Sequence, residues 1–214
     1  MITLYVLGFE MIDFGSCGTQ KGCFRFDREN SACPNDYCEY GATYRVENQN
    51  VHFELTSLSD WVAIGFSSDD RMGGDDIVIC KRMHGGGHVG HYFSQGYMPP
   101  IERSNGAISD TQVRYEDGRI TCRFSRALKV NIDNTYVDFN NDWYQLYAWG
   151  PVSDGGAIMQ HYLDNTPASH RKLVLSHRRN EIRNRATHLQ LSATLVPFTL
   201  LLSSLLPLQS MYLF

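Results

Sequence analysis

The amino-acid sequence of 214 residues lacks several features that mark common functional classes. It has no long basic stretch with interleaved aromatic residues, and its formal net charge is -4, so we expect no DNA or RNA binding. It contains no G-x-S-x-G, no H-E-x-x-H and no glycine-rich phosphate loop that leads into a helix. The sequence therefore gives no support to a hydrolase or to a nucleotide-binding enzyme.

Sustained helical periodicity is also missing before residue 177. Apolar residues occur instead in short alternating runs, in which Val51, Phe53 and Leu55 face one way and their polar neighbours face the other. Gly, Asn, Asp and Pro separate these runs at roughly 8 to 12 residue intervals, which predicts an all-β fold, an antiparallel β-sandwich. The predicted strands are Thr43–Val46, Val51–Leu55, Trp61–Phe66, Asp76–Cys80, Val89–Phe93, Val113–Tyr115, Arg119–Ser125, Tyr136–Phe139, Trp143–Trp149 and Lys172–Ser176.

The cysteines are even in number, and most lie near the N-terminus. No Cys-x-x-Cys pair occurs, which disfavours a zinc site and favours disulfides in an oxidising compartment such as the secretory lumen or the cell exterior. Spacing does not fix the pairing, but Cys80 and Cys122 each lie in a strand-like run, and a bridge between them is the best single prediction. The disulfide candidates are Cys17, Cys23, Cys33, Cys38, Cys80 and Cys122.

Composition divides the chain into four parts. Residues 1–42 form a cysteine-rich lead-in, and residues 43–176 hold the predicted sandwich. Residues 177–188 form a basic polar stalk, and residues 189–214 form a hydrophobic segment. The sequence therefore predicts one domain of ordinary size that is followed by a membrane-attachment segment.

The hydrophobic segment belongs to a longer stretch, Ala186–Phe214, that contains no Asp, Glu, Lys or Arg. Because a helix needs roughly 20 apolar residues to span a bilayer, we expect membrane attachment, although Pro197 and Pro207 weaken a helix there. Both a retained single-pass anchor and a cleaved lipid-anchor signal, with its small residues near Asn184–Ala186, fit this pattern. The arginines of the stalk favour a cytosolic domain, but we give the cysteines more weight and expect a lumenal or extracellular one.

Met72 lies in a polar loop between two strand-like runs. A methionine in a loop is usually a side chain that folds back on the edge of its domain, since thioethers fill gaps in cores. The alternative is a soft axial ligand to haem iron, for which Met with His is a known pair. The neighbouring Asp69, Asp70, Asp75 and Asp76 could hold calcium, but they do not have the spacing of an EF-hand loop, so turn formation or strand capping explains them best.

The histidines offer two candidate sites. His84, His88 and His91 lie in a glycine-rich stretch, and a flexible exposed loop is the better interpretation for them than a helical metal site. His161 follows the run Trp143–Trp149, a turn and a returning run, and in a sandwich that return can bring it beside the loop of Met72. The alternative is a surface histidine at the end of a strand.

Residues 43–176 resemble the DOMON domain family. The resemblance rests on the strand, methionine loop and strand WVAIGFSSDDRMGGDDIVIC, the aromatic late strand YQLYAWGP and the histidine that follows it. It implies a β-sandwich, and the cytochrome-type members imply haem b held between Met72 and His161.

Within this family the chain is most similar to the ferric-chelate-reductase-like branch, through CGTQKGCFRF, RITCRFSRAL, NTPAS and the hydrophobic tail. Ferric-chelate reductases add a multi-helix cytochrome region, whereas a single hydrophobic segment occurs here, so we expect no reductase activity. The branch is linked to the assembly and trafficking of AMPA-type glutamate receptors in the endoplasmic reticulum and at synapses. The resemblance thus implies a non-catalytic, membrane-tethered partner of AMPA-type receptor subunits, with a haem b electron-transfer domain as the alternative.

Overall fold

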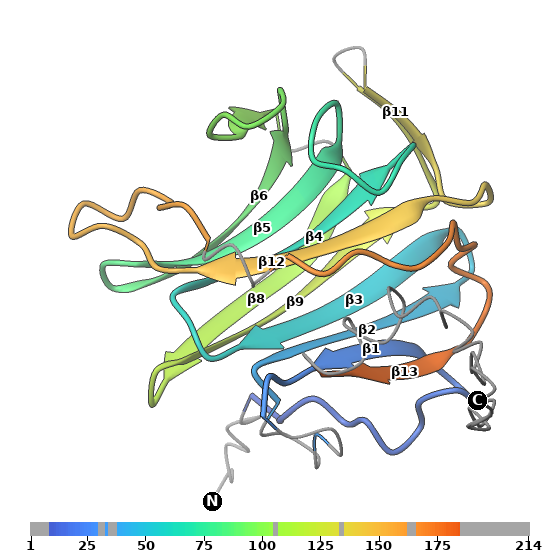
Figure 1. The fold of residues 1–214 in the computed structure, drawn as a ribbon, viewed down its shortest axis with the longest axis horizontal. Coiled ribbons are helices and arrows are strands. Elements are labelled where there is room, and N and C mark those ends of the chain that lie inside the picture. The colour runs from blue at the N-terminus through green and yellow to red at the C-terminus, as the bar shows by residue number, and fades with distance from the viewer. Residues whose placement is uncertain are drawn as a thin grey trace, which may run out of the picture.

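The computed structural model describes residues 9–29, 33, 38–104, 107–132, 135–161 and 166–184, and within them all regular structure is β. One sheet has six strands in the order β13-β1-β2-β3-β9-β8, and the other has five in the order β12-β4-β5-β6-β7. Figure 1 shows these sheets as two layers, with the hairpin β10–β11 at one end. The predicted all-β sandwich is confirmed. The strands are β1 Gly22–Phe26, β2 Tyr40–Glu47, β3 Asn50–Ser57, β4 Trp61–Ser67, β5 Asp76–Met83, β6 Gly86–Phe93, β7 Ile101–Arg103, β8 Ile108–Glu116, β9 Arg119–Ala127, β10 Lys129–Ile132, β11 Thr135–Asp138, β12 Tyr144–Gly150 and β13 Asn180–Arg183.

Short polar turns connect the antiparallel strands, as the sequence predicts. Glu47 pairs with Asn50 across the β2–β3 hairpin, and the intervening Asn48 has a φ of 55°. Asparagine tolerates this left-handed conformation because its short side chain can hydrogen-bond locally. The turn fixes the register, so Val51, Phe53 and Leu55 all face the core.

The core between the sheets is built mainly from aromatic rings. Phe24 on β1 stacks on Tyr147 of β12 with ring centroids 3.9 Å apart, and Phe53 stacks on Phe124 at 5.0 Å. Trp149 is 1% exposed and lies against Tyr40. Rings of this size bury much apolar area each, so these pairs fill the space between the two layers.

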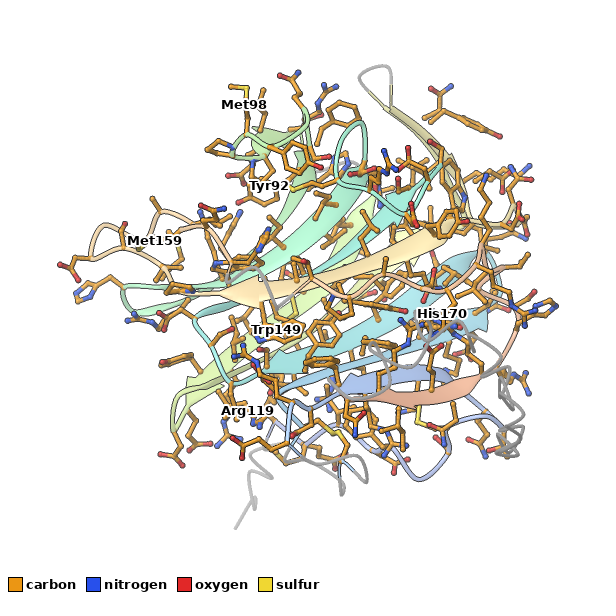
Figure 2. The ribbon with its side chains drawn as sticks, viewed as in Figure 1. Tyr92, Met98, Arg119, Trp149, Met159 and His170 are labelled. Carbon is orange, nitrogen blue, oxygen red and sulfur yellow. A yellow bond between two sulfur atoms is a disulfide. The ribbon has the colours of Figure 1, made fainter. Side chains whose placement is uncertain are left out.

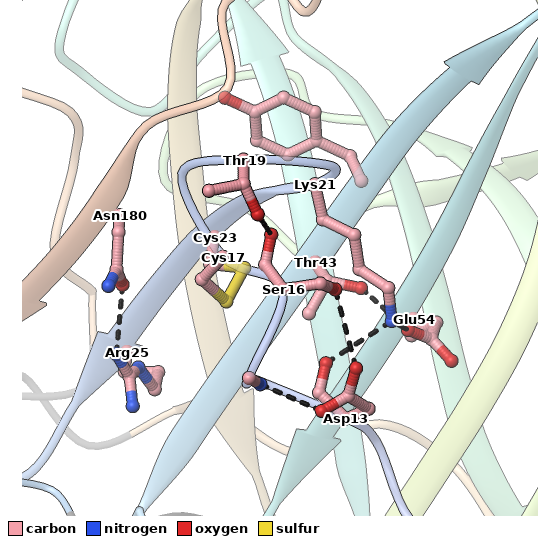
Figure 3. Close-up of a disulfide and its surroundings, with 12 residues drawn as sticks. Asp13, Ser16, Cys17, Thr19, Lys21, Cys23, Arg25, Thr43, Glu54 and Asn180 are labelled. Atoms are coloured by element: carbon pink, nitrogen blue, oxygen red, sulfur yellow. Dashed lines mark hydrogen bonds and ion pairs between the residues drawn. A yellow bond between two sulfur atoms is a disulfide. The ribbon is translucent and has the colours of Figure 1, made fainter.

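The six cysteines form three disulfides, Cys17–Cys23, Cys33–Cys38 and Cys80–Cys122. The predicted bridge between Cys80 and Cys122 is confirmed, and it joins β5 of one sheet to β9 of the other. Figure 3 shows Cys17–Cys23 at the start of β1, beside a hydrogen-bonded turn in which the Thr19 hydroxyl donates to Ser16. The N-terminal bridges close short loops, whereas Cys80–Cys122 links the two layers.

The six-stranded sheet extends beyond the predicted sandwich range of 43–176 at both ends. β1 comes from the predicted lead-in, and β13 comes from the predicted stalk, with which β1 pairs in parallel. Arg183 of β13 is 6% exposed, donates to the carbonyl of Ala168 and lies over the ring of Phe24. Arg183, which belongs to the predicted basic stalk, therefore helps to hold the last described strand against the sheet.

Two other predictions, a late strand and the membrane-attachment segment, are not confirmed. Lys172–Ser176 is not a strand, because its only ladder contact is an isolated bridge between Leu173 and Trp143. The membrane-attachment segment 189–214 lies outside the described residues. Among the residues that are described, no helix meets the length and hydropathy that a bilayer span requires.

Candidate functional site

The loop between β4 and β5 carries Met72 and is stabilised by hydrogen bonds from its backbone N–H groups to its own aspartate side chains. Gly73 and Gly74 have positive φ angles of 142° and 79°, which side chains with a Cβ rarely adopt. The N–H of Gly73 donates to Asp75 Oδ2 at 2.6 Å, and the N–H of Arg71 donates to Asp69 Oδ1 at 2.9 Å. These contacts confirm the turn-forming interpretation for Asp69 and Asp75, and Met72 itself is half-buried.

Asp75 connects this loop to the end of β6. It is fully buried, and its Oδ2 also accepts a hydrogen bond of 2.7 Å from the hydroxyl of Ser94. Backbone hydrogen bonds reinforce the contact, since Gly74 N–H donates to the carbonyl of Ser94 and Ser94 N–H donates to that of Asp75. The loops that follow β4 and β6 are therefore joined into one structure at this end of the five-stranded sheet.

The next residue, Asp76, holds a buried ionic cluster between the two sheets. Arg126 of β9 donates to both of its carboxylate oxygens, and His91 Nε2 lies 2.7 Å from Asp76 Oδ2. Asp76, His91 and Arg126 are 3%, 1% and 0% exposed. Because Cys80–Cys122 joins the same two strands, β5 and β9 are linked by one ionic and one covalent contact.

The electrostatics of Asp76 favour its charged form. Burial by itself raises the pKa of this carboxyl, but the hydrogen bonds and positive charge supplied by Arg126, together with the contact from His91, outweigh it and lower the pKa. A buried carboxylate of this kind is stable only when it is paired. The cluster therefore holds the sheets together, and its residues are enclosed by protein.

The predicted flexible loop is wrong for two of the three histidines in the glycine-rich stretch. His88 and His91 lie in β6, not in a flexible loop. His88 Nε2 lies 2.7 Å from Glu102 Oε1 on the neighbouring β7, and His91 belongs to the buried cluster. No group of three or more metal-ligating side chains occurs in the part of the chain that the structure describes.

Met72 and His161 are carried by segments that leave opposite ends of β4 and its partner strand. The loop of Met72 follows Ser67, which pairs with Tyr144 at the start of β12. His161 follows the far end of β12, since Met159 N–H, two residues before it, donates to the carbonyl of Pro151. About 20 Å of strand separates these two ends, so both segments must extend over the outer face of the sheet to share a ligand.

That outer face carries a second apolar cluster, made of Trp61, Ala63, Ile79 and Tyr92, and Ile158 packs against it. The indole Nε1 of Trp61 is buried without a hydrogen-bond partner. In its donor chemistry the set suits haem iron, because a thioether with an imidazole is a known axial pair and an apolar cluster lies on the face between the two segments. The pairing of Met72 with His161 stays a prediction.

A polar groove with a volume of about 350 Å³ lies on the outer face of the six-stranded sheet. Glu54 lies at its centre and accepts hydrogen bonds from Lys21, Thr43 and Arg123. Figure 3 shows Lys21 reaching Glu54 from the turn that precedes β1. Burial raises the pKa of Glu54, but these partners outweigh it and lower the pKa. The Glu54 carboxylate is therefore paired within the protein.

Comparison with known proteins places these features in a family. The model of the DOMON domain matches residues 36–150, which begins before the predicted range at 43 and ends with β12. The chain is 41% identical over 165 residues to the DOMON domain-containing protein FRRS1L of Mus musculus, which covers 76% of this chain and 55% of that protein. It is 30% identical over 142 residues to the putative ferric-chelate reductase 1 of Danio rerio, which covers 65% of this chain and 25% of that protein.

A solved structure is also similar. The cytochrome b domain of pyranose dehydrogenase from Coprinopsis cinerea superposes with a TM-score of 0.48 at 9% identity, over 66% of this chain and 79% of that one. The chain spans about half the length of its FRRS1L relatives. The family model matches more than half of the chain and agrees with the strands, the methionine loop and the aromatic late strand described above. The chain belongs to the DOMON domain family.

Proposed function

We propose that this protein is a non-catalytic, membrane-tethered binding module that regulates the assembly or trafficking of AMPA-type glutamate receptors. Its domain faces the lumen of the endoplasmic reticulum or the cell exterior, where its three disulfides persist. Its partners in this proposal are receptor subunits and the bilayer that holds its C-terminal segment.

The observation that carries the proposal is the 41% identity to FRRS1L over 165 residues. This match is longer than the DOMON domain match at residues 36–150, so it includes part of the chain outside the domain. The fold supports it in one respect. The space between the sheets is filled by packed rings and by the Asp76 cluster, so the outer surfaces are what the described domain offers to a partner. A rigid body of this kind binds at low cost in conformational entropy.

Co-purification tests the proposal. The full chain, with an affinity tag, is expressed with AMPA-type receptor subunits, and the membranes are solubilised in mild detergent. We expect the subunits to be recovered with the wild-type chain and not with an unrelated disulfide-bonded membrane protein at matched expression. Recovery at the level of that unrelated protein contradicts the proposal.

A haem b electron-transfer domain is the second candidate, and the apolar outer cluster between the segments of Met72 and His161 favours it. Those two residues would hold the iron, and the group would supply one-electron transfer. Trp61, Ala63 and Ile79 would pack against it and exclude water from that side.

An absorption spectrum tests the second candidate. The purified chain is incubated with haem, and Met72→Ala and His161→Ala are compared with Met159→Ala, which changes an exposed methionine near His161. The candidate predicts a Soret band that the first two substitutions shift and the third leaves unchanged. If none of the three alters the spectrum, this ligand pair is refuted.

A further inference from the structure

The loop between β6 and β7 exposes an unusual amount of apolar surface. Tyr97 is 90% exposed, Met98 is 63% exposed and Ile101 is 48% exposed. Residues 95–101, which we name the apolar loop, contain no Asp, Glu, Lys or Arg. Single exposed apolar residues are normal, but contiguous ones on a monomer often mark an interaction site.

The apolar loop is held in place at both ends. Ser94, before it, is completely buried and bonds to Asp75, as described above. At its other end, Ile101 is the first residue of β7 and pairs with Phe93. Arg103 pairs with His91, whose Nδ1 lies 3.3 Å from the carbonyl oxygen of Ser104. Figure 2 shows Met98 at the outer limit of the molecule and Tyr92 nearer to the sheet.

The backbone of the loop is also restricted internally. Pro99 and Pro100 each have φ fixed near -65°, and Gly96 provides the one left-handed turn, at a φ of 77°. A loop with fixed ends and two prolines loses little conformational entropy when it binds. Tyrosine and methionine are enriched at interfaces, and truncating a central aromatic residue usually has the largest effect on binding.

We infer that the apolar loop docks into an apolar, weakly charged depression on the water-exposed part of a membrane-protein partner. This inference rests on the proposed function for the identity of that partner. It adds the surface that makes the contact, with Tyr97 and Met98 as its central side chains.

The bilayer is a less suitable occupant because of where the loop lies. β6 packs against β8, so β7 and the apolar loop lie at the β8 edge of the sandwich, whereas β13 lies at the opposite edge of the six-stranded sheet. Figure 1 shows β6 and β13 on opposite sides of the molecule. The predicted membrane segment 189–214 follows β13 closely in sequence, so a bilayer that holds it lies on the side away from the apolar loop.

A second copy of this chain is also disfavoured. β7 is an edge strand of three residues, and antiparallel pairing of two copies about its centre places Glu102 opposite Glu102. Like charges directly opposite each other destabilise such a pair. Glu102 already binds His88 and Tyr92 of its own chain, and moving it away breaks both contacts.

The test compares two full-length variants in the co-purification with AMPA-type receptor subunits. Tyr97→Ser/Met98→Ser changes the apolar loop, and the matched control Tyr136→Ser/Met11→Ser changes residues that are 57% and 51% exposed elsewhere. We expect recovery of the subunits to fall at least about fivefold with the first variant and to stay at the wild-type level with the control. Both variants must keep the melting temperature of the wild type.

The outcomes separate the two proposals. If the wild-type chain recovers no subunits, the proposed function fails, and the docking inference that rests on it is lost as well. If the wild type and both variants recover subunits equally, the docking inference alone fails. An equal loss with both variants also overturns it, because the effect is then not specific to the apolar loop.

Two further measurements can overturn the inference in favour of the other occupants. The first measurement uses vesicles of brominated phosphatidylcholine and compares the tryptophan fluorescence that Tyr97→Trp and Tyr136→Trp each add to the protein. We expect the two added signals to be quenched equally. Stronger quenching of the Tyr97→Trp signal assigns the loop to the bilayer. In detergent, sedimentation should give the same mass for the wild type and the loop variant. A lower mass for the loop variant assigns the loop to a second copy.

Discussion

Two neighbouring regions of the five-stranded sheet differ in which kind of side chain they bury and which kind they expose. At the start of β5, Asp76 is buried with Arg126 and His91 between the sheets. A few residues after His91 in the chain, Tyr97 and Met98 extend into solvent. Charge lies inside and apolar surface lies outside, the reverse of the usual distribution.

The contrast shows which region serves folding and which is available for binding. The ionic cluster is enclosed, has its partners in the protein and links β5 to β9, so its loss acts on stability. The apolar loop gains nothing for stability from side chains that touch water. Substitutions should therefore separate the two regions, with large effects on unfolding in the cluster and small ones in the loop.

The largest effect is expected from Arg126→Met. This change leaves the buried Asp76 carboxylate with His91 as its only side-chain partner, and breaking a buried pair in this way costs about 3–5 kcal/mol. Urea denaturation of the disulfide-bonded domain measures the change.

The matched control is Arg45→Met, because Arg45 pairs with Glu47 at the surface with half of each side chain exposed. This substitution should change the free energy of unfolding by less than about 1 kcal/mol. Equal effects of the two substitutions contradict a role of the cluster in stability.

The covalent contact between the same strands is expected to have an effect of similar size. Cys80→Ala/Cys122→Ala opens a loop with a sequence separation of 42, for which the chain-entropy model gives about 4 kcal/mol. Cys17→Ala/Cys23→Ala opens one with a separation of 6, for which the same model gives about 2 kcal/mol. Denaturation under identical conditions ranks the two variants, and the reverse order shows that the link between the sheets is not the stronger constraint.

The cluster also predicts a dependence of stability on pH. The folded pKa of Asp76 is lowered, so its contribution is present above the unfolded pKa, near 3.9, and is lost as pH falls through the folded pKa. The difference in the free energy of unfolding between the wild type and Asp76→Asn should therefore be largest near neutral pH and shrink below about pH 4. Denaturation midpoints of both proteins across this range measure it. A difference that is constant with pH argues that Asp76 is not charged in the folded state.

The smallest effect is expected in the apolar loop. Tyr97→Ser/Met98→Ser removes side chains that are mostly in solvent, and its free energy of unfolding should stay within about 0.5 kcal/mol of the wild type. Thermal melting of the two proteins side by side checks this. A marked loss of stability shows that the loop packs on the domain, and the contrast between the two regions then disappears.

Local sequence patterns were sufficient for most strands. The alternation of Val51, Phe53 and Leu55, the asparagine turn before them and the strand-like surroundings of Cys80 and Cys122 each depend on near neighbours, and the structure agrees with all of them. Period-two alternation records which face is buried, and that information is carried by each strand separately.

Local patterns predicted Val89–Phe93 of β6, but they did not predict its first residues or the buried ionic cluster. Asp76 looked like a turn-forming or strand-capping residue, and the glycines before His91 suggested a flexible loop. Gly87 has a packing role instead, since a Cβ on it would lie 2.3 Å from a methyl carbon of Val113 on β8. A polar residue in a strand can be recognised as buried only when its partner from the other sheet is known, and Arg126 lies far away in sequence.

The sequence by itself determined that the chain forms a β-sandwich with disulfides, because alternation and turn chemistry are local properties of the chain. Tertiary structure alone decided that β1 and β13 pair in parallel, that Asp76 meets Arg126 and His91 across the sheets, and that Tyr97 is exposed. Each of these depends on which distant segments lie side by side, and such contacts form only when the two layers pack.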